Sequence, residues 1–324
     1  MTLKKNNIII GFDTSCYTTS IAAISLDKEV ILNEKILLKV KKESKGLRQS
    51  EAVFQHVNNL GELGKSINKT LKEYNVVGVC ASSKPRPLDN SYMPVFNVGC
   101  NFARLISSIN NCSYFETSHQ ENHIEASLLN NNLKNKERFL AVHMSGGTTE
   151  ILLVNKKLDG YNIDIVGSSL DISFGQLIDR IGVNLGYNFP CGRYIDENAM
   201  KCNLKIKEGL KTSVKEGYMN LSGIENQINK VLNDYPKEYT CKLLLDTLVR
   251  CMYKSLAYIC REYEINEVLF AGGVSASKYI SKELRNKFKR DEVTIYFTES
   301  QYATDNALGC AIIGLNQILL GENV

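Results

Sequence analysis

Short apolar runs separated by small polar residues dominate the first third of the chain. Unbroken apolar runs of about four to eight residues are typical of buried strands, and apolar residues at every third or fourth position are typical of a helix with one buried face. A small, polar segment at residues 14–20 divides the first two runs and predicts a hairpin. These criteria predict strands at residues 8–13, 21–25, 30–38 and 76–81, and helices at about 52–67 and 97–109.

The second half of the chain repeats this plan. Apolar runs at residues 139–144 and 151–154 flank another small, polar segment, and Thr18-Thr19-Ser20-Ile21 lines up with Thr148-Thr149-Glu150-Ile151 at an offset of 130 residues. Many α/β proteins contain such hairpins, so the short match is not specific by itself. Two equivalent hairpins, each at the head of an α/β half, favour a duplicated fold of two lobes around a central cleft.

Glycine-rich turns recur after the apolar runs of the second half. Gly146 and Gly147 lie in the second hairpin, and Gly272 and Gly273 lie between an expected strand and an expected helix. Glycines let backbone N–H groups approach phosphate oxygens closely, and a helix N-terminus attracts an anion. Together with the small residues of the first hairpin, these turns predict a nucleotide site.

Composition narrows the class of protein. With 324 residues the chain is long enough for two domains, and its net charge of 39 − 35 = +4 permits a nucleic-acid partner without requiring one. The ten cysteines form no Cys-x-x-Cys pair, so neither a zinc ribbon nor a small disulfide framework is expected. No apolar stretch approaches the roughly 20 residues of a membrane span, and no long apolar leader precedes the first strand. We therefore expect a protein of the reducing cytoplasm.

Two of the four histidines, His119 and His123, lie four residues apart in a segment without glycine or proline. On a helix this spacing places both imidazoles on one face, where they can hold one metal ion. Ser118 is a plausible N-cap for that helix. The alternative, two unrelated surface histidines, stays open on spacing alone.

Several short motifs along the chain resemble those of the TsaD family, formerly labelled glycoprotease. Gly11-Phe12-Asp13-Thr14-Ser15-Cys16 resembles the family's G-[ILF]-[ED]-T-S-C, and His119-Gln120-Glu121-Asn122-His123 resembles its H-x-E-G-H, with Asn122 in place of the glycine. Further matches in the same order are Met144-Ser145-Gly146-Gly147, Leu170-Asp171 through Asp179, Pro190-Cys191-Gly192, Ala271-Gly272-Gly273-Val274-Ser275 and Thr304-Asp305-Asn306.

The resemblance implies a duplicated actin-like ATPase (ribonuclease H-like) fold. It implies transfer of a threonylcarbamoyl group from threonylcarbamoyl-AMP to the exocyclic amine of an adenosine beside the tRNA anticodon. Carried over residue by residue, it makes His119, His123 and Asp305 the ligands of one divalent ion, iron or zinc. It places Ser145, Gly146, Gly147, Thr148, Gly272, Gly273 and Ser277 at an adenine nucleotide or acyl-adenylate, with Asp179 at the ribose and Gly192 close by. Asp13 and Asp171 are the expected catalytic side chains.

The chain also departs from the family's pattern. Tyr17-Thr18 replaces an acidic pair, and further substitutions stand at Thr148, Ile172, Gln176 and Ser277. The metal ligands are kept while groups around the substrate differ, which indicates a diverged paralogue. Two alternatives therefore stay open: a non-catalytic nucleotide-binding or scaffold paralogue, and a carbamoyl transferase with a different acceptor.

The resemblance also suggests domains and partners. Residues 1–130 would form an N-terminal lobe with the histidine helix, residues 131–304 a C-terminal lobe with a helical insertion, and residues 305–324 a helix that packs back on the first lobe. The implied partners are a TsaB-like subunit, a TsaE-like ATPase and tRNA. A homodimer is left open, and no membrane is expected.

Overall fold

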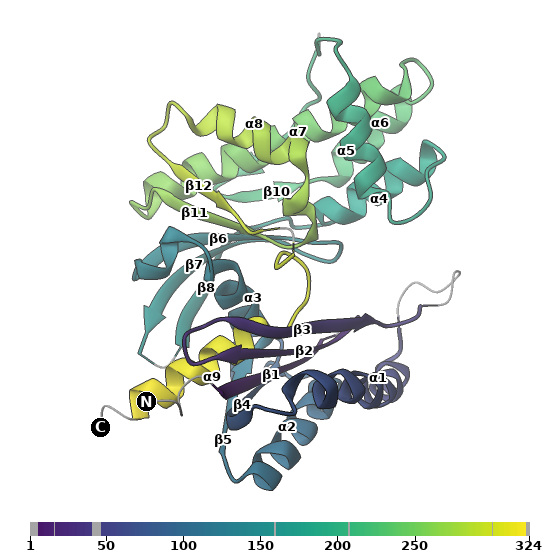
Figure 1. Ribbon diagram of the computed structural model, residues 1–324. Helices are drawn as coiled ribbons and strands as arrows, with labels where there is room; N and C mark the ends of the chain where they lie inside the picture. The colour runs from purple at the N-terminus through teal and green to yellow at the C-terminus, as the bar shows by residue number, and fades with distance from the viewer. Residues whose placement is uncertain are drawn as a thin grey trace. The chain divides into compact units, whose positions relative to one another are not determined.

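The computed structural model describes residues 6–15, 17–40, 47–158, 160–206, 208–299 and 301–321, so Cys16 of the opening motif lies outside the described residues. The chain divides into two compact units (Figure 1). The first comprises Met1–Asn130, Lys156–Asn162 and Asp305–Val324, and the second comprises Asn131–Asn155 and Ile163–Thr304.

The first unit is built on a mixed sheet of strand order β3-β2-β1-β4-β5. Strand β1 pairs antiparallel with β2 and parallel with β4, and β4 pairs parallel with β5. The strands are β1 (Asn7–Ser15), β2 (Thr18–Ser25), β3 (Val30–Leu37), β4 (Asn75–Lys84) and β5 (Ser113–Ser118). The helices are α1 (Gln49–Leu71), α2 (Phe96–Asn110), α3 (His119–Leu128) and α9 (Leu308–Gly321).

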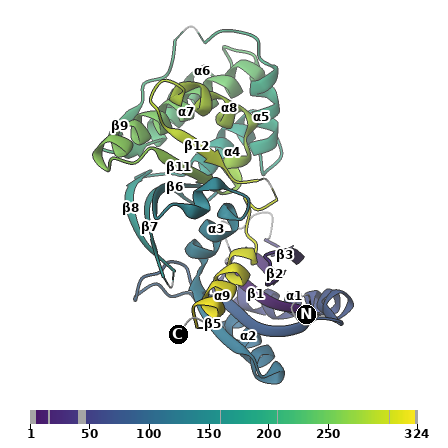
Figure 2. The same ribbon diagram turned by 60° about the vertical axis from the view of Figure 1, so that its left-hand side comes forward.

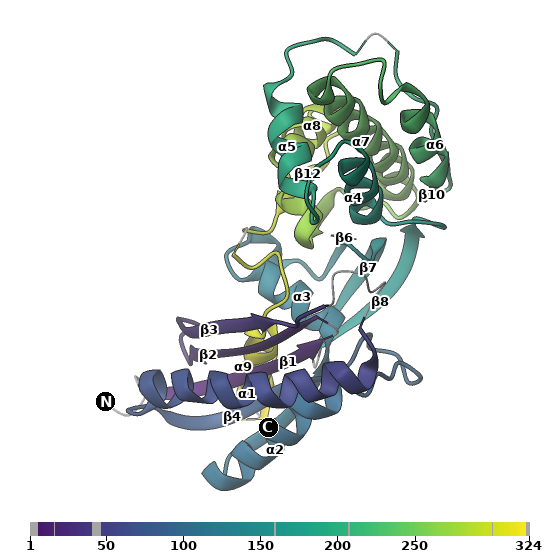
Figure 3. The ribbon, with the colours of Figure 1, turned by 90° about the vertical axis from the view of Figure 1, so that its right-hand side faces the viewer.

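Both faces of this sheet are covered. Ile8, Ile10 and Phe12 of β1 pack in one cluster with residues of α1 and α2, which lie side by side in Figure 3. The other face carries α9, which lies beside β1 and β5 in Figure 2. Any side chain at Gly11 would overlap the backbone at Ala307 and Ala311, so this glycine lets α9 approach β1 closely. Burial on both faces explains why β1 reads as an unbroken apolar run.

The second unit repeats the arrangement with the strand order β12-β11-β6-β7-β8. Strand β6 pairs antiparallel with β7 and parallel with β11, as β1 does with β2 and β4. The strands are β6 (Arg138–Met144), β7 (Thr149–Lys157), β8 (Gly160–Ser168), β11 (Glu267–Ala271) and β12 (Thr294–Phe297), with a separate hairpin of β9 (Ser213–Lys215) and β10 (Tyr218–Asn220). The helices are α4 (Phe174–Asn184), α5 (Gly192–Lys201), α6 (Ser222–Val231), α7 (Lys237–Glu262) and α8 (Lys278–Phe288), with 3₁₀ turns at Asn132–Asn135 and Gly273–Ala276.

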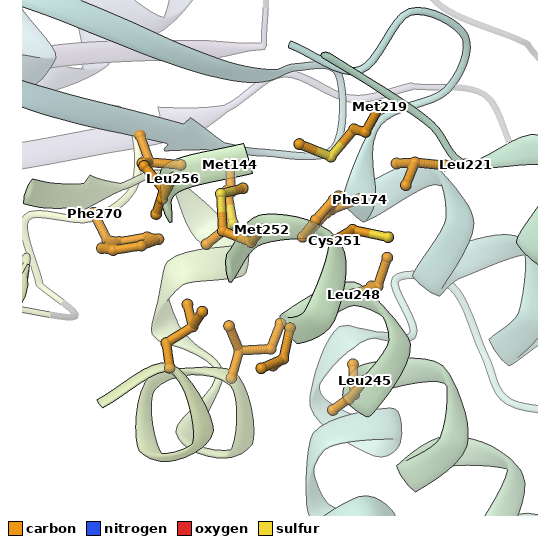
Figure 4. Close-up of a cluster of buried hydrophobic side chains, with 14 of the residues drawn as sticks. Met144, Phe174, Met219, Leu221, Leu245, Leu248, Cys251, Met252, Leu256 and Phe270 are labelled. Carbon is orange, nitrogen blue, oxygen red and sulfur yellow. The ribbon is translucent and has the colours of Figure 1, made fainter. Parts of the chain in front are cut away.

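Helix α7 provides the centre of the second unit's core. Its buried side chains, among them Leu248, Met252 and Leu256, pack with Met144 of β6 and Phe270 of β11 (Figure 4). These five side chains are fully buried. Full burial of a side chain of this size stabilises a fold by about 1.5–3 kcal/mol, so this cluster fixes the sheet beneath the helices.

The duplicated plan is confirmed, because both sheets have the same strand order and each is headed by an antiparallel hairpin. The expected strands and helices of the first third are present within a few residues of the predicted bounds. The expected break at residues 14–20 was too wide: β1 extends to Ser15 and β2 begins at Thr18. The threonines and serines of this segment (Thr14, Ser15, Thr18, Thr19 and Ser20) are buried, and their hydroxyl groups have partners, such as the carbonyl of Val95 for Thr14 at 2.9 Å. In the described ranges, no helix has both the length and the apolar character needed to cross a membrane.

Candidate metal and nucleotide sites

Helix α3 presents the two histidines of the first unit. Ser118 is its N-cap: the Ser118 hydroxyl accepts from the N–H of Glu121 at 3.2 Å, and the Glu121 carboxylate accepts from the N–H of Ser118 at 2.9 Å. This reciprocal pair is a capping box, which the sequence Ser-x-x-Glu encodes locally. The predicted helix and its N-cap are confirmed.

Asn122, between the two histidines, joins α3 to the start of α9. Its side-chain N–H donates to the carbonyl of Asn306 at 2.6 Å, and its side-chain oxygen accepts from the N–H of Cys310 at 2.9 Å. A side chain at Gly309 would overlap the backbone of Asn122, so the two helices meet backbone to backbone. Asp305, just before α9, is thereby brought to the histidines. The residue that departs from the family's H-x-E-G-H pattern thus helps to assemble the site.

His119, His123 and Asp305 each direct one ligand atom to a common point, and these atoms all lie within 4.8 Å of one another. Nε2 of His123 lies 3.1 Å from Nε2 of His119 and 3.3 Å from Oδ1 of Asp305, and Nε2 of His119 lies 3.9 Å from that oxygen. Two nitrogens bound to one zinc ion at about 2.0–2.1 Å and tetrahedral angles lie about 3.3 Å apart. Two imidazoles and one carboxylate are also an ordinary ligand set for iron or zinc. The donor set therefore fits a divalent metal ion.

The electrostatics of the cluster agree with a site built for positive charge. Burial lowers the pKa of His119, but the charge of Asp13 and its hydrogen bond, with a contribution from Asp305, raise this pKa to about 9. Burial raises the pKa of Asp305, and the hydrogen bond with His123 and the charges of both histidines outweigh it, so this pKa lies well below its usual value. The carboxylates of Asp13 and Asp305 therefore favour a positive charge beside them.

In the second unit, the turn between β6 and β7 contains Ser145, Gly146, Gly147 and Thr148. The Ser145 hydroxyl accepts from the N–H groups of Thr148 at 3.0 Å and Gly147 at 3.3 Å. Both glycines are exposed, and a side chain at either would meet nothing within 4 Å. The turn therefore leaves open backbone, as an anion site needs.

The N-terminus of α4 lies against this turn, which the sequence interpretation missed. The hydroxyl of Ser173, the N-cap of α4, donates to the carbonyl of Gly146 at 2.8 Å. A side chain at Gly175 would overlap the backbone of Ser145 and Gly146. The capping box Ser173-x-x-Gln176 was a readable signal for this helix start.

At the start of α8, where an anion was predicted to bind, the structure has a carboxylate of the protein itself. Asp196 of α5 accepts from the Ser277 hydroxyl and from the N–H groups of Lys278 at 3.1 Å and Tyr279 at 3.0 Å. Its carboxylate already occupies the place where a phosphate would bind to the helix N-terminus. Gly272, with a φ of 92°, packs against the carbonyl of Met144, which only glycine can do. No sequence pattern indicated that Asp196 would cap this helix.

Of the remaining predicted residues of the second unit, Asp179 and Asp171 accept hydrogen bonds from backbone N–H groups of neighbouring segments. Asp179 accepts from the N–H of Cys191 at 2.7 Å, and burial raises the pKa of Asp179 while this bond offsets part of the rise. Gly192 opens α5 with free space around it. Asp171 accepts from the N–H groups of Leu221 at 2.8 Å and Ser222 at 2.9 Å. These bonds outweigh burial and lower the pKa of Asp171, which suits an anchor for the start of α6 better than a base.

A family model described as "TsaD: tRNA N6-adenosine threonylcarbamoyltransferase" matches residues 91–312. The chain belongs to the TsaD family. It is 27% identical over 319 residues to a tRNA N6-adenosine threonylcarbamoyltransferase of Thermotoga neapolitana, with 97% of this chain and 95% of the relative covered. A protein of the same name from a Sulfurihydrogenibium species is 27% identical over 316 residues, with 95% and 89% covered.

Solved structures similar to this TsaD-family chain confirm its fold class. HypF of T. kodakarensis matches with a TM-score of 0.64 and 13% identity, over 97% of this chain and 48% of that one. Component A of the (R)-2-hydroxyglutaryl-CoA dehydratase of Acidaminococcus fermentans matches with a TM-score of 0.56 and 11% identity, over 96% and 99%. These neighbours have the duplicated actin-like ATPase fold.

Two of the departures from the TsaD pattern have local roles in this chain. Gln176 completes the capping box of α4, and Ser277 is the N-cap of α8. A third, Thr18, donates a hydrogen bond to Oδ2 of Asp305 at 2.8 Å. These substituted side chains therefore belong to helix caps and to the candidate metal site.

Proposed function

We propose that this TsaD-family protein is a metal-dependent transferase that moves a threonylcarbamoyl group from threonylcarbamoyl-AMP to the exocyclic amine of an adenosine beside the tRNA anticodon. Family membership and near full-length similarity to proteins of that name support the reaction. The observation that carries the proposal is the convergence of His119, His123 and Asp305, because the two histidines of α3 and the aspartate just before α9 are far apart in the sequence. A chain that had kept only the fold would have no need of this cluster.

In this proposal His119, His123 and Asp305 hold a divalent ion, iron or zinc, which supplies Lewis-acid polarisation and orientation of donor oxygen atoms. The open turn at Gly146 and Gly147 binds the phosphate of the acyl-adenylate, which would share the N–H of Gly147 with the Ser145 hydroxyl, its acceptor at 3.3 Å. The attacking amine is conjugated with the adenine ring and weakly nucleophilic, so the contribution of the protein is mainly to bind and orient the two substrates.

The predicted roles of the other residues divide in two. Gly192 and Asp179 remain proposed neighbours of the ribose. For Asp171 and Ser277, we favour anchoring roles, because their oxygen atoms are already bonded to helix starts. Gly272 and Gly273 would shape the turn after β11 instead of binding phosphate at the α8 N-terminus, which Asp196 occupies.

The alternative is a paralogue that binds an adenine nucleotide, or serves as a scaffold, without transfer. The side chains at Tyr17, Gln176 and Ser277 favour it, because they differ from the family's pattern. A transfer assay separates it from the proposal: purified protein is incubated with tRNA and threonylcarbamoyl-AMP, with and without TsaB-like and TsaE-like proteins, and the nucleosides are analysed by mass spectrometry. Threonylcarbamoyladenosine is the expected product. Nucleotide binding without this product would support the non-catalytic paralogue. A carbamoylated product on another acceptor would support a carbamoyl transferase with a different acceptor.

The metal site is tested by the metal content of anaerobically purified protein. We expect about one equivalent of iron or zinc in the parent protein, and a loss of most of it in His119→Ala and Asp305→Ala, because each substitution leaves two ligands. His143→Ala is the control, since His143 lies on β6 in the second unit. A metal-free parent, or variants that retain the metal, would contradict the site.

The partners and location stay predictions. A TsaB-like subunit would need an apolar surface, and α1 of the first unit carries Phe54 and Val57, which are 67% and 45% exposed. A TsaE-like ATPase, a homodimer and a cytoplasmic location carry no structural argument of their own. The tRNA substrate follows from the proposed reaction.

A further inference from the structure

Asp13 of β1 is fully buried and lies directly behind the first histidine. Its Oδ2 and Oδ1 atoms lie 3.0 and 3.1 Å from Nδ1 of His119. Ser82 of β4, also fully buried, donates its hydroxyl hydrogen bond to Oδ1 of Asp13. Asp13 is therefore held between its own sheet and the imidazole, with no freedom to reach toward a substrate.

This geometry decides which nitrogen of His119 can bind a metal. A carboxylate only accepts hydrogen bonds, so Nδ1 must carry the proton. In neutral imidazole the lone pair then belongs to Nε2, and Nε2 is the atom that lies 3.1 Å from Nε2 of His123. The carboxylate thus selects the tautomer that the three-donor cluster requires.

A second contact does the same for the third ligand. Thr18 donates to Oδ2 of Asp305 at 2.8 Å, with Ser15 at 3.5 Å from the same oxygen. The other oxygen, Oδ1, is the one that lies 3.3 Å from His123. With Oδ2 occupied, Asp305 offers a single oxygen to the site.

We propose that Asp13 is a positioning residue that fixes His119 in its Nδ1–H form and so sets the metal affinity of the site, with Thr18 orienting Asp305 in the same way. This inference rests on the proposed metal site and revises the expected role of Asp13, which was catalytic. Hydrogen-bond partners of metal ligands typically change metal affinity about 10- to 100-fold when they are removed.

The test is the affinity for Zn²⁺, measured by competition with a chromophoric chelator at constant pH. Asp13→Asn keeps the shape of the side chain, but its oxygen can accept from Ser82 while its NH₂ group faces Nδ1, which favours the opposite tautomer. We expect binding about 10- to 100-fold weaker than in the parent protein. Thr18→Val should also weaken binding, and Thr18→Ser, which keeps the hydroxyl, should restore it.

Glu125→Gln is the matched control. Glu125 is a buried carboxylate on the same helix as the ligands, and it accepts a hydrogen bond from the Tyr161 hydroxyl at 2.6 Å instead of touching a histidine. Glutamine can accept the same bond, so the affinity for Zn²⁺ should stay at the parent value. Equal weakening in Glu125→Gln and Asp13→Asn would reduce Asp13 to a general structural role and overturn the inference.

Histidine ¹⁵N spectra of the zinc-loaded parent protein give a readout that requires no Asp13 variant to fold. His119, assigned by comparison with His119→Gln, should show a protonated Nδ1 and a metal-bound Nε2. A metal-bound Nδ1, or an Asp13→Asn protein that binds Zn²⁺ as tightly as the parent, would overturn the positioning role alone. A parent protein that binds no Zn²⁺ would overturn the metal site itself, and the inference with it.

Discussion

Several buried hydroxyl groups in the first unit have specific hydrogen-bond partners. Thr14 donates to the carbonyl of Val95 and accepts from the N–H of Gly99 at 3.0 Å, and Thr19 lies 2.8 Å from Nδ1 of His56. An unpaired buried polar group costs about 1–3 kcal/mol, so such pairs allow a hairpin of threonine and serine to lie inside the sheet. His56 is itself fully buried, and burial opposes its protonation.

His56 should make the stability of the protein fall in mild acid. Burial lowers the pKa of His56, and the charge of Asp13 and the backbone of Ser15 offset only part of this effect. The unfolded chain takes up a proton near its ordinary pKa of about 6.5, whereas the folded protein resists protonation until a lower pH. The stability contributed by neutral His56 is therefore complete above about pH 6.5 and is lost as the pH falls toward the folded-state pKa.

Urea unfolding at pH 8 and pH 5.5 measures this loss in the parent protein and in His56→Asn. Asparagine keeps a hydrogen-bonding group near the position of Nδ1 and does not titrate. The variant should be less stable at both pH values, because a smaller side chain leaves a cavity, yet its loss between pH 8 and pH 5.5 should be smaller. An equal loss in both proteins would show that His56 does not contribute to the pH dependence.

Helices α3 and α9 form the pair of elements that assembles the candidate metal site. Asn122 supplies hydrogen bonds in both directions between them, and Gly309 removes the side chain that would hold them apart. The position of Asp305 relative to the histidines therefore depends on a backbone contact between two helices. Disruption of this contact between α3 and α9 should affect both the stability of the first unit and metal binding.

Gly309→Ala should destabilise the first unit by about 1–3 kcal/mol and weaken metal binding, because the added methyl group overlaps the backbone of Asn122. Gly61→Ala is the matched control: Gly61 is exposed on α1, and a side chain there meets nothing within 4 Å. Alanine is a better helix former by about 1 kcal/mol, so the control should be slightly stabilised. Chemical denaturation and Zn²⁺ affinity check both, and a neutral Gly309→Ala would mean that α9 can shift without loss.

At the scale of the whole molecule, the two units share a sheet order but differ in chemistry. All three candidate metal ligands belong to the first unit, whereas the glycine turn at Gly146 and Gly147 belongs to the second. The two units therefore have equivalent frames, and different side chains give each frame its own candidate site. A ligand for one site should consequently stabilise one unit.

Zn²⁺ should protect the first unit selectively against hydrogen exchange. A ligand that binds only the folded state at 100 times its Kd adds about 2.7 kcal/mol of stability. We expect slower exchange in α3, at the start of α9 and in the β1–β2 hairpin, with little change in α4 to α8. Mass spectrometry of peptides with and without Zn²⁺ makes the comparison, and His123→Ala, which lacks a ligand, should show no change. Uniform protection of both units would contradict a site confined to the first.

The sequence by itself determined the local elements and the duplication. Apolar runs marked β1 and β6, the Ser-x-x-Glu pattern marked the start of α3, and helical spacing put His119 and His123 on one face. These features depend on residues within one or two turns of each other, so periodicity and capping chemistry are sufficient to find them. The order of seven short motifs was likewise enough to indicate the family.

Only the tertiary structure decided which groups are available for chemistry. Asp196 occupies the α8 helix start that sequence had assigned to an anion, and Asp171 anchors the start of α6. Asp13 and His119 are 106 positions apart, and Ser82 contacts Asp13 from a neighbouring strand. Such contacts depend on how strands and helices pack across long sequence separations. Local patterns of residues do not contain that information.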